Sequence, residues 1–270
     1  MTLDLEKNAQ IFSRDLGHGD APALLLHCSQ GHSGMFRVIA SKLSEQFHMV
    51  APDWPGHGKS ADWAPDVAYH SQATDIAAGL LKEGSLVIGH SFGATVALRM
   101  ALEHPGKVKA LVLIEPVLFA AARGTQNYDE GLKGQMKLAK ILEEDPALAA
   151  RLFNKAWGGA KWDSFSAEAQ ALMAQQMRFV VGTGQSLWED EHNILAPGRL
   201  ETLTCPVQFI RGAETDGIIE CIHANLASRL PNAAETIVPE AGHMVVLSHP
   251  QAVVDVAQEA WSAAQNRNND

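Results

Sequence analysis

The stretch "LVIGHSFGA", residues 86–94, decides the fold. Its first three residues form an apolar run that is typical of a buried strand, and "ATVALRMALEHP", which follows the motif, is typical of a helix. Ser91 lies between them in the pattern Gly-x-Ser-x-Gly. A tight strand-to-helix turn holds a serine hydroxyl in an exposed, strained position, so the pattern predicts a nucleophile. An ordinary glycine-rich turn is the alternative interpretation.

Buried strands and amphipathic helices alternate on both sides of this motif. Strands are expected in "APALLLH", "HMVAPDW", "SLVIGHS" and "VKALVLIE", and helices in "MFRVIASKLSE" and "SQATDIAAGLLKE". The alternation resumes later with "CPVQFIRGAE", "IIECIHANLASRLP", "AETIVPEAGH" and "SHPQAVVDVAQEAWSAA". This order predicts an α/β fold: a mostly parallel central sheet with helices on both faces.

The alternation stops between residues 120 and 196, where the pattern is mostly helical. One helix is expected in "DPALAARLFNKAWG", with Asp145 as its N-cap and Pro146 in its first turn. We therefore predict a core domain made of residues 1–119 and 197–270, interrupted by a helical cap, or lid, at 120–196. Several Trp, Met and Phe residues of the cap are expected to pack in its core, and some to face a site beneath it.

Composition indicates a globular protein with a sizeable core, and the partner that we expect for it is a small-molecule substrate. Of the 270 residues, 46% are hydrophobic and 19% charged, and the formal net charge is -10. Such a chain repels nucleic acid and anionic membranes, and no basic run offsets that. The N-terminus lacks an apolar signal segment and the three cysteines are widely spaced, so we expect a cytoplasmic protein with free thiols and no metal site. For the oligomeric state, we expect a monomer or a homodimer.

A serine nucleophile needs a base and an orienting acid, which we seek where strands end. His243, in "PEAGHMVV", follows the last expected strand and is the candidate base. Asp216, in "FIRGAETDGII", is the candidate acid that would hold the imidazole by its Nδ1–H. Glu214 is the nearest competitor, and Glu115, at the end of "LVLIE", is a second one.

Backbone N–H groups should form the oxyanion hole. Phe92, directly after the nucleophile and at a helix start, is expected to supply one, since the helix dipole favours negative charge there. Ser29, in "HCSQGHSG", is expected to supply the other, with His27 bracing that loop. The order Ser91, Asp216, His243, each at a strand exit, is hard to obtain by chance and favours a catalytic triad.

The chain resembles the α/β-hydrolase family of the lid-bearing serine type. The matching segments are "LLLHCSQGHSG", "VAPDWPGHGKS", "VIGHSFGA", "PVQFIRGAETD" and "EAGHMVVLSHP", which cover nearly the whole core domain. The resemblance implies nucleophile Ser91, acid Asp216 and base His243. It also implies a structural role for "DWPGHGKS", so His57 is not expected to be catalytic. Cys28 departs from the family, which usually has glycine at that position.

The resemblance implies a cytoplasmic serine hydrolase that cleaves a small carboxylic ester or related acyl compound through an acyl-enzyme, without metal or organic cofactor. Trp157 of the cap and Met244, beside the base, are expected to line the substrate pocket. One alternative is a carbon–carbon bond hydrolase of a diketone-like acid, whose carboxylate would need a cation such as Arg178 or Lys161. The other is a catalytically silent, receptor-like binding protein.

Overall fold

An eight-stranded sheet forms the centre of the computed structural model, which describes residues 2–5, 9–64 and 66–267. The strands are β1 (Thr2–Leu5), β2 (Ala9–Leu16), β3 (Ala21–Leu26), β4 (Phe47–Pro52), β5 (Ser85–His90), β6 (Val108–Ile114), β7 (Val207–Gly212) and β8 (Ala233–Val238). Their order is β1-β2-β4-β3-β5-β6-β7-β8. Strand β2 pairs antiparallel with β1 and β4, and all other neighbouring pairs are parallel. The predicted mostly parallel sheet is confirmed, although the sequence pattern predicted neither β1 nor β2.

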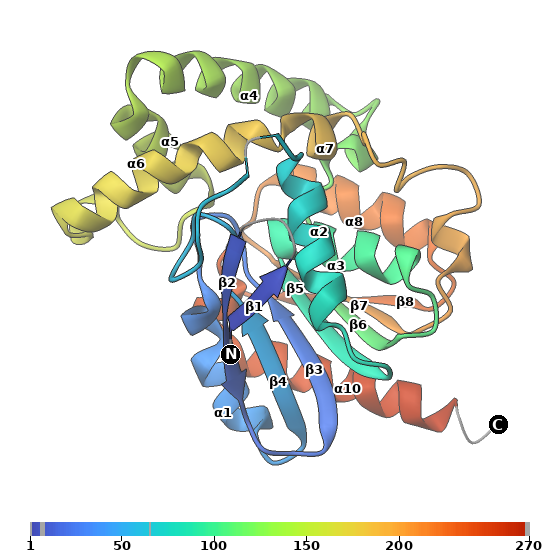
Figure 1. Cartoon of the computed structure of the whole chain (residues 1–270). Helices are drawn as coiled ribbons and strands as arrows, with labels where there is room; N and C mark the ends of the chain where they lie inside the picture. The colour runs from blue at the N-terminus through green and yellow to red at the C-terminus, as the bar shows by residue number, and fades with distance from the viewer. Residues whose placement is uncertain (1, 6–8, 65, 268–270) are drawn as a thin grey trace.

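Helices cover both faces of the sheet (Figure 1). The core-domain helices are α1 (Arg37–Leu43), α2 (Tyr69–Leu80), α3 (Phe92–Glu103), α8 (Gly217–Arg229), α9 (Val245–Ser248) and α10 (Pro250–Asn266). Side chains of α1 and α10 pack against one face of the sheet, and those of α2, α3 and α8 against the other. Because successive strand residues point to opposite faces, Val87 joins one core and Ile88 the other. Continuous apolar strands are the signature of a sheet buried on both faces.

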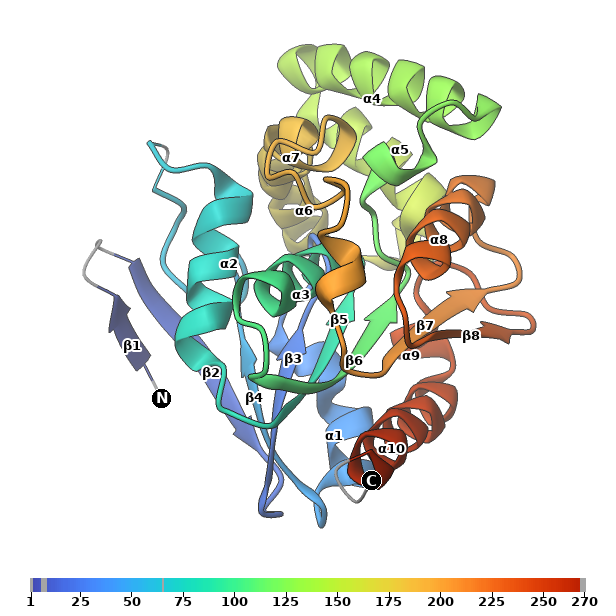
Figure 2. The same cartoon turned by 90° about the vertical axis from the view of Figure 1, so that its right-hand side faces the viewer.

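Four helices between β6 and β7 form a cap at one end of the sheet (Figure 2). They are α4 (Gln126–Glu144), α5 (Pro146–Trp157), α6 (Ala167–Gly182) and α7 (Gly184–Trp188). The carboxylate of Asp145 accepts a hydrogen bond from the Leu148 N–H, with Pro146 at the first position, as the sequence predicted. Before the cap, a short 3-10 helix at Phe119–Ala122 is buried in the main core. The cap helices therefore begin a few residues later than residue 120.

Helix α6 is fixed to the core domain by both polar and aromatic contacts. Gln176 Nε2 donates to the carbonyl of Gly56 at 3.1 Å, and the Phe179 ring lies 5.0 Å from the His57 ring. Arg178 forms an ion pair with Asp62. Helix α6 therefore packs on the segment of residues 53–62, which follows β4.

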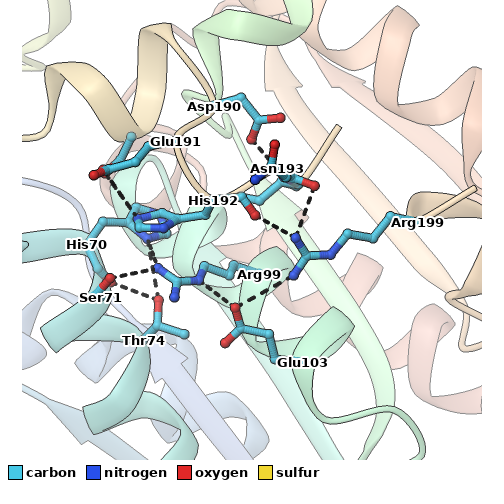
Figure 3. A network of polar contacts seen from close by, with 12 residues as sticks. His70, Ser71, Thr74, Arg99, Glu103, Asp190, Glu191, His192, Asn193 and Arg199 are labelled. Carbon is cyan, nitrogen blue, oxygen red and sulfur yellow. Dashed lines mark hydrogen bonds and ion pairs between the residues drawn. The ribbon is translucent and has the colours of Figure 1, made fainter. Parts of the chain in front are cut away.

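A polar network joins the segment after α7 to helices α2 and α3 (Figure 3). Glu103 of α3 accepts from Arg99 Nε at 2.7 Å and lies 3.6 Å from Arg199. Arg199 in turn donates to the carbonyls of His192 and Asn193. The chain is therefore fixed to the core domain on both sides of the cap. The buried 3-10 helix fixes it before α4, and this polar network fixes it after α7. No helix within the described ranges is long and apolar enough to cross a membrane.

Candidate active site

Ser91 occupies a strained corner between β5 and α3. Its backbone has φ 56° and ψ -117°, in the left-handed region that residues with a side chain rarely adopt. The flanking glycines make the corner possible, because a Cβ on Gly89 would lie 2.5 Å from the Gly93 oxygen. A Cβ on Gly93 would lie 2.2 Å from the Leu26 oxygen. The pattern Gly-x-Ser-x-Gly is therefore required by close backbone packing around the serine.

His243 lies within hydrogen-bond distance of the serine. Its Nε2 is 3.0 Å from Ser91 Oγ, and its side chain is buried. The loop between β8 and α9 that carries it is held by His90, whose Nε2–H donates to the His243 carbonyl at 2.9 Å. The Trp157 ring packs edge-on, 4.8 Å from the imidazole. Position His90 was not singled out in the sequence, although it adjoins the nucleophile.

The carboxylate bound to His243 is that of Glu115. Its Oε2 lies 2.8 Å from His243 Nδ1, and the side chain is fully buried. It also accepts hydrogen bonds from the Gly212 N–H at 2.7 Å and from Thr215 Oγ1 at 2.5 Å. A carboxylate only accepts, so Nδ1 carries the proton and Nε2 is left to accept from Ser91. Ser91, His243 and Glu115 thus form one hydrogen-bonded chain.

The assignment of the acid to Asp216 is corrected by this geometry. Asp216 is the exposed N-cap of α8, and its Oδ1 accepts from the Ile218 N–H at 3.0 Å. Glu214 is also exposed. The loop after β7 instead supplies donors to Glu115, which enters from the neighbouring strand β6. The sequence feature that pointed to Glu115 was its position directly after the apolar run "LVLI".

The electrostatics of the site fit these roles. Burial raises the pKa of Glu115, but its hydrogen bonds from His243, Thr215 and Gly212 outweigh burial and leave the pKa below its ordinary value. Glu115 therefore stays ionised at neutral pH. Burial lowers the pKa of His90 to about 3, so this ring stays neutral beside the His243 imidazole.

Phe92 and Ser29, the two expected oxyanion donors, lie on segments next to the serine, and their role stays a prediction. Phe92 begins α3, where first-turn N–H groups have no partner within the helix. Ser29 lines the same cavity as Ser91. The loop that carries it is braced by His27, whose Nε2 accepts from the Trp54 N–H at 2.9 Å. His57, predicted to be non-catalytic, accepts from the Gln30 N–H at 3.1 Å and is a second brace.

Cys28 occupies the family's glycine position without becoming reactive. Its side chain is buried, and burial raises the pKa of the thiol to about 12. Thiolate is the nucleophilic form, so this cysteine is chemically inert at neutral pH. Its backbone needs no positive φ, and its carbonyl accepts from the Gly31 N–H at 3.1 Å within the loop turn.

A cavity of about 490 Å³ lies between Ser91 and His243 on one side and the cap helices on the other. Ser91, His243 and Ser29 lie on its floor, and Trp157 lines it as the sequence predicted. Met244 does not line it, because its side chain packs toward the loop at Gly159, where a Cβ would lie 3.1 Å from Met244 Cβ. The remaining lining is mainly apolar and includes Val117, Phe119, Leu138, Phe153, Val180 and Trp188.

The cations considered for a diketone-like acid lie elsewhere. Arg178 pairs with Asp62 and packs over the Phe179 ring, and neither it nor Lys161 lines the cavity. Among the described residues on the cavity wall, the only lysine or arginine is Lys137 of α4, which is largely exposed. The structure thus gives a substrate carboxylate no buried cationic partner in this part of the chain.

Comparison with known proteins agrees with this architecture. Residues 23–256 match the model of the alpha/beta hydrolase family, and the chain belongs to that family. Among solved structures, an esterase (EaEST) from Exiguobacterium antarcticum superposes with a TM-score of 0.73 at 16% identity. The alignment covers 94% of this chain and 96% of that one. The predicted fold and family are therefore confirmed.

Several curated relatives have names that state an activity, and two of them align over most of both chains. A pimeloyl-[acyl-carrier protein] methyl ester esterase of Yersinia enterocolitica is 27% identical, over 93% of this chain and 98% of the relative. The lipase LipV of Mycobacterium tuberculosis is 29% identical, over 88% of this chain and 92% of the relative. These similarities support the prediction of a carboxylic ester hydrolase.

Proposed function

We propose that the protein is a serine hydrolase that cleaves a carboxylic ester with an apolar acyl chain through an acyl-enzyme intermediate. The observation that carries the proposal is the hydrogen-bonded chain from Ser91 through His243 to Glu115, on the floor of a mainly apolar cavity. The relatives named as esterase and lipase support the same reaction class.

Each group then has a distinct role in acyl transfer. His243 Nε2 removes the proton from Ser91 Oγ as the oxygen attacks the ester carbonyl, and the resulting imidazolium is stabilised by Glu115. The N–H groups of Phe92 and Ser29 stabilise the tetrahedral oxyanion. His243 then protonates the departing alcohol, and water repeats the cycle on the acyl-enzyme.

The left-handed backbone of Ser91 supports the nucleophile assignment over that of a plain turn. Strain at a non-glycine residue costs about 1–3 kcal/mol and persists where the surrounding structure enforces it. Here the strain points the hydroxyl at His243 and leaves the Phe92 N–H at the helix start for the oxyanion. No metal or organic cofactor has a step in this reaction.

The test combines a fluorophosphonate reagent with p-nitrophenyl esters. We expect covalent labelling of Ser91 and turnover of acetate, butyrate and longer esters by the wild-type protein. Ser91→Ala should abolish labelling and reduce turnover by at least about 10³-fold, since it removes the nucleophile.

The matched control is Ser33→Ala, which changes a buried serine outside the triad, at the start of the 3-10 helix Ser33–Phe36. It should retain labelling and turnover if it folds. A folded wild-type protein that neither reacts with the reagent nor turns over any ester contradicts the proposal and favours a receptor-like binding role.

A further inference from the structure

Helix α4 lies across the cavity and contacts the rest of the protein near both of its ends. At its N-terminal end, Asn127 Nδ2 donates to Cys221 Sγ of α8 at 3.3 Å, and Tyr128 Oη donates to the Trp188 carbonyl at 3.1 Å. At its C-terminal end, Leu138 and Ile141 pack against a small apolar core shared with α5 and α6. None of the helix's 19 residues is buried. Leu132, in the second turn, packs against the main core, and the turn after it, which contains Gly134, lies between the two supported ends.

Two glycines occupy the inner face of α4, one turn apart, in different surroundings. A Cβ on Gly131 would lie 2.7 Å from the Trp188 ring and 3.2 Å from Ile218 Cδ1, so this glycine lets the helix approach its support. Gly134 is exposed like its neighbour Lys133, a Cβ on it would meet no atom within 4 Å, and it lines the cavity, which Lys133 does not. Gly134 is therefore a place where the helix leaves space over the site rather than one where it makes a contact.

The two directions along α4 differ in polarity. Toward the N-terminal end, the cavity wall carries Asn127, Glu130 and Asp216. Asp216 follows Thr215, which binds the acid of the triad, so this polar end adjoins the His243–Glu115 side. Beyond Gly134, the wall carries two polar residues of α4, Gln135 and Lys137, and is otherwise apolar, formed by Leu138, Ile141, Leu152, Phe153 and Val180.

The leaving alcohol must lie where His243 can protonate it, and hence toward the polar end. The acyl chain then extends in the opposite direction, under Gly134 and into the apolar end. From Gly134 to Ile141 the helix rises about 10 Å, since each residue adds about 1.5 Å. That length matches an extended acyl chain of medium size.

We propose that Gly134 is the specificity-determining residue of the acyl site: its missing side chain lets a medium-length apolar acyl chain pass beneath α4. The inference rests on the proposed ester hydrolase function and adds the substrate class, esters of medium-chain acids. A side chain at this position points into the channel, while the short acyl group of an acetate ester ends before it.

The experiment compares Gly134→Ala and Gly134→Leu with the wild type on p-nitrophenyl acetate, butyrate, octanoate and decanoate. For Gly134→Leu, we expect kcat/KM for octanoate and decanoate to fall at least tenfold relative to acetate. Gly134→Ala should give a smaller loss in the same order. The matched control is Lys133→Leu, which adds the same side chain at the preceding, exposed position of α4.

An unchanged chain-length profile in folded Gly134→Leu overturns the proposal, and so does an equal loss on all esters. Thermal melting checks the fold of each variant. A second readout keeps this test separate from that of ester turnover: the labelling rate of Ser91 by phosphonates with methyl and octyl chains. If Gly134→Leu slows only the octyl reagent, the acyl channel is supported even where turnover is absent. If no reagent labels the wild type, the ester hydrolase proposal is contradicted, and the acyl-site proposal that rests on it is contradicted as well.

Discussion

Glu115 and Ser91 leave adjacent strands at the same level of the sheet, and both do so with positive φ. The Ser91 N–H donates to the carbonyl of Ile114, the residue before Glu115, at 2.8 Å. The φ angles are 56° for Ser91 and 49° for Glu115. The two strained exits turn both side chains toward His243, which contacts Ser91 through Nε2 and Glu115 through Nδ1. The nucleophile and the acid are therefore positioned by a single strand pair, β5 and β6.

The first prediction separates the two candidate acids. Glu115→Gln keeps the size of the side chain but removes the charge that stabilises the imidazolium, so kcat for p-nitrophenyl butyrate should fall by about 10³- to 10⁴-fold. Asp216→Asn keeps the cap of α8 and should retain kcat within about threefold. Steady-state kinetics of both variants at neutral pH provides the measurement. If Asp216→Asn lowered kcat more than Glu115→Gln, Asp216 and not Glu115 would be the acid that orients His243.

The positions of Ser91 and His243 at strand exits could be predicted from the sequence, because residues next to them in the chain determine the local turns. Gly89 and Gly93 mark the tight corner around Ser91, and the glycine before His243 marks a loop at a strand end. The choice of acid depends on long-range pairing. The sequence shows that Glu115 and Asp216 each follow a strand, but it does not show which carboxylate reaches the imidazole. That outcome depends on donors from Gly212 and Thr215, which only the folded sheet brings to Glu115.

The cap was predictable as helical but not in its arrangement. The α4 segment is amphipathic, with half-buried Leu132, Leu138 and Ile141, but none of its residues is fully buried, and Gly131 and Gly134 are poor helix formers. Its helix forms because its ends are supported by α5, α6 and α8. Met244 was misplaced for a related reason: proximity to His243 in the chain does not fix the direction of the side chain. Trp157, far away in sequence, reaches the cavity through the path of α5.

The second prediction concerns Thr215 as a positioning residue for the acid. Its hydroxyl donates to Glu115 Oε2, and this bond contributes to the lowered pKa of Glu115. Thr215→Val keeps the shape but removes the donor, so kcat should fall about tenfold, the scale of one hydrogen bond to a charged group. The pKa of Glu115 should rise, and activity should therefore be lost at a higher pH on acidification.

Thr215→Ser is the rescue control, because it restores the hydroxyl. Its kcat and its pH profile should return to near the wild-type values. If Thr215→Val lowers thermal stability but leaves the pH profile of kcat unchanged, Thr215 is only a structural residue.

The third prediction tests whether cap helix α6 supports the oxyanion loop. Gln30 follows the donor Ser29 and has φ 61°; its Nε2 donates to the Met173 carbonyl at 2.9 Å and contacts Met177 Sδ at 3.3 Å. Gln30→Ala frees the loop from the cap, so oxyanion stabilisation should weaken. We expect kcat to fall about tenfold with KM within twofold, less than the loss of a whole oxyanion donor.

Gln176→Ala is the matched control for this coupling. It removes a comparable amide bond between α6 and the core, to the Gly56 carbonyl at 3.1 Å, but does not touch the oxyanion loop. It should lower the free energy of unfolding by about 1 kcal/mol and leave kcat within twofold. Equal kinetic effects of the two variants would mean that general loosening of the cap, and not the Gln30 contact, affects catalysis.

The fourth prediction is a loss of stability in mild acid, caused by histidines that are buried in the neutral form. Burial lowers the pKa of His57 to about 4 and that of His90 to about 3, and it lowers the pKa values of His27 and His70 well below 6.5. Their pKa values in the unfolded chain are about 6.5, so the unfolded state binds more protons as the pH falls below that value. The free energy of unfolding should therefore decrease from pH 6.5 downward. Each histidine contributes up to about 1.4 kcal/mol per pH unit until its folded-state pKa is reached.

Urea unfolding at pH 7.5, 6 and 5 measures this dependence. His90→Gln removes one of the four titrating groups while keeping a donor for the His243 carbonyl, so its stability should fall less steeply between pH 6 and 5 than that of the wild type. His18→Gln, at an exposed position, is the control and should keep the wild-type slope. The same slope in all three proteins would show that the neutral burial of His90 does not determine the acid sensitivity of the fold.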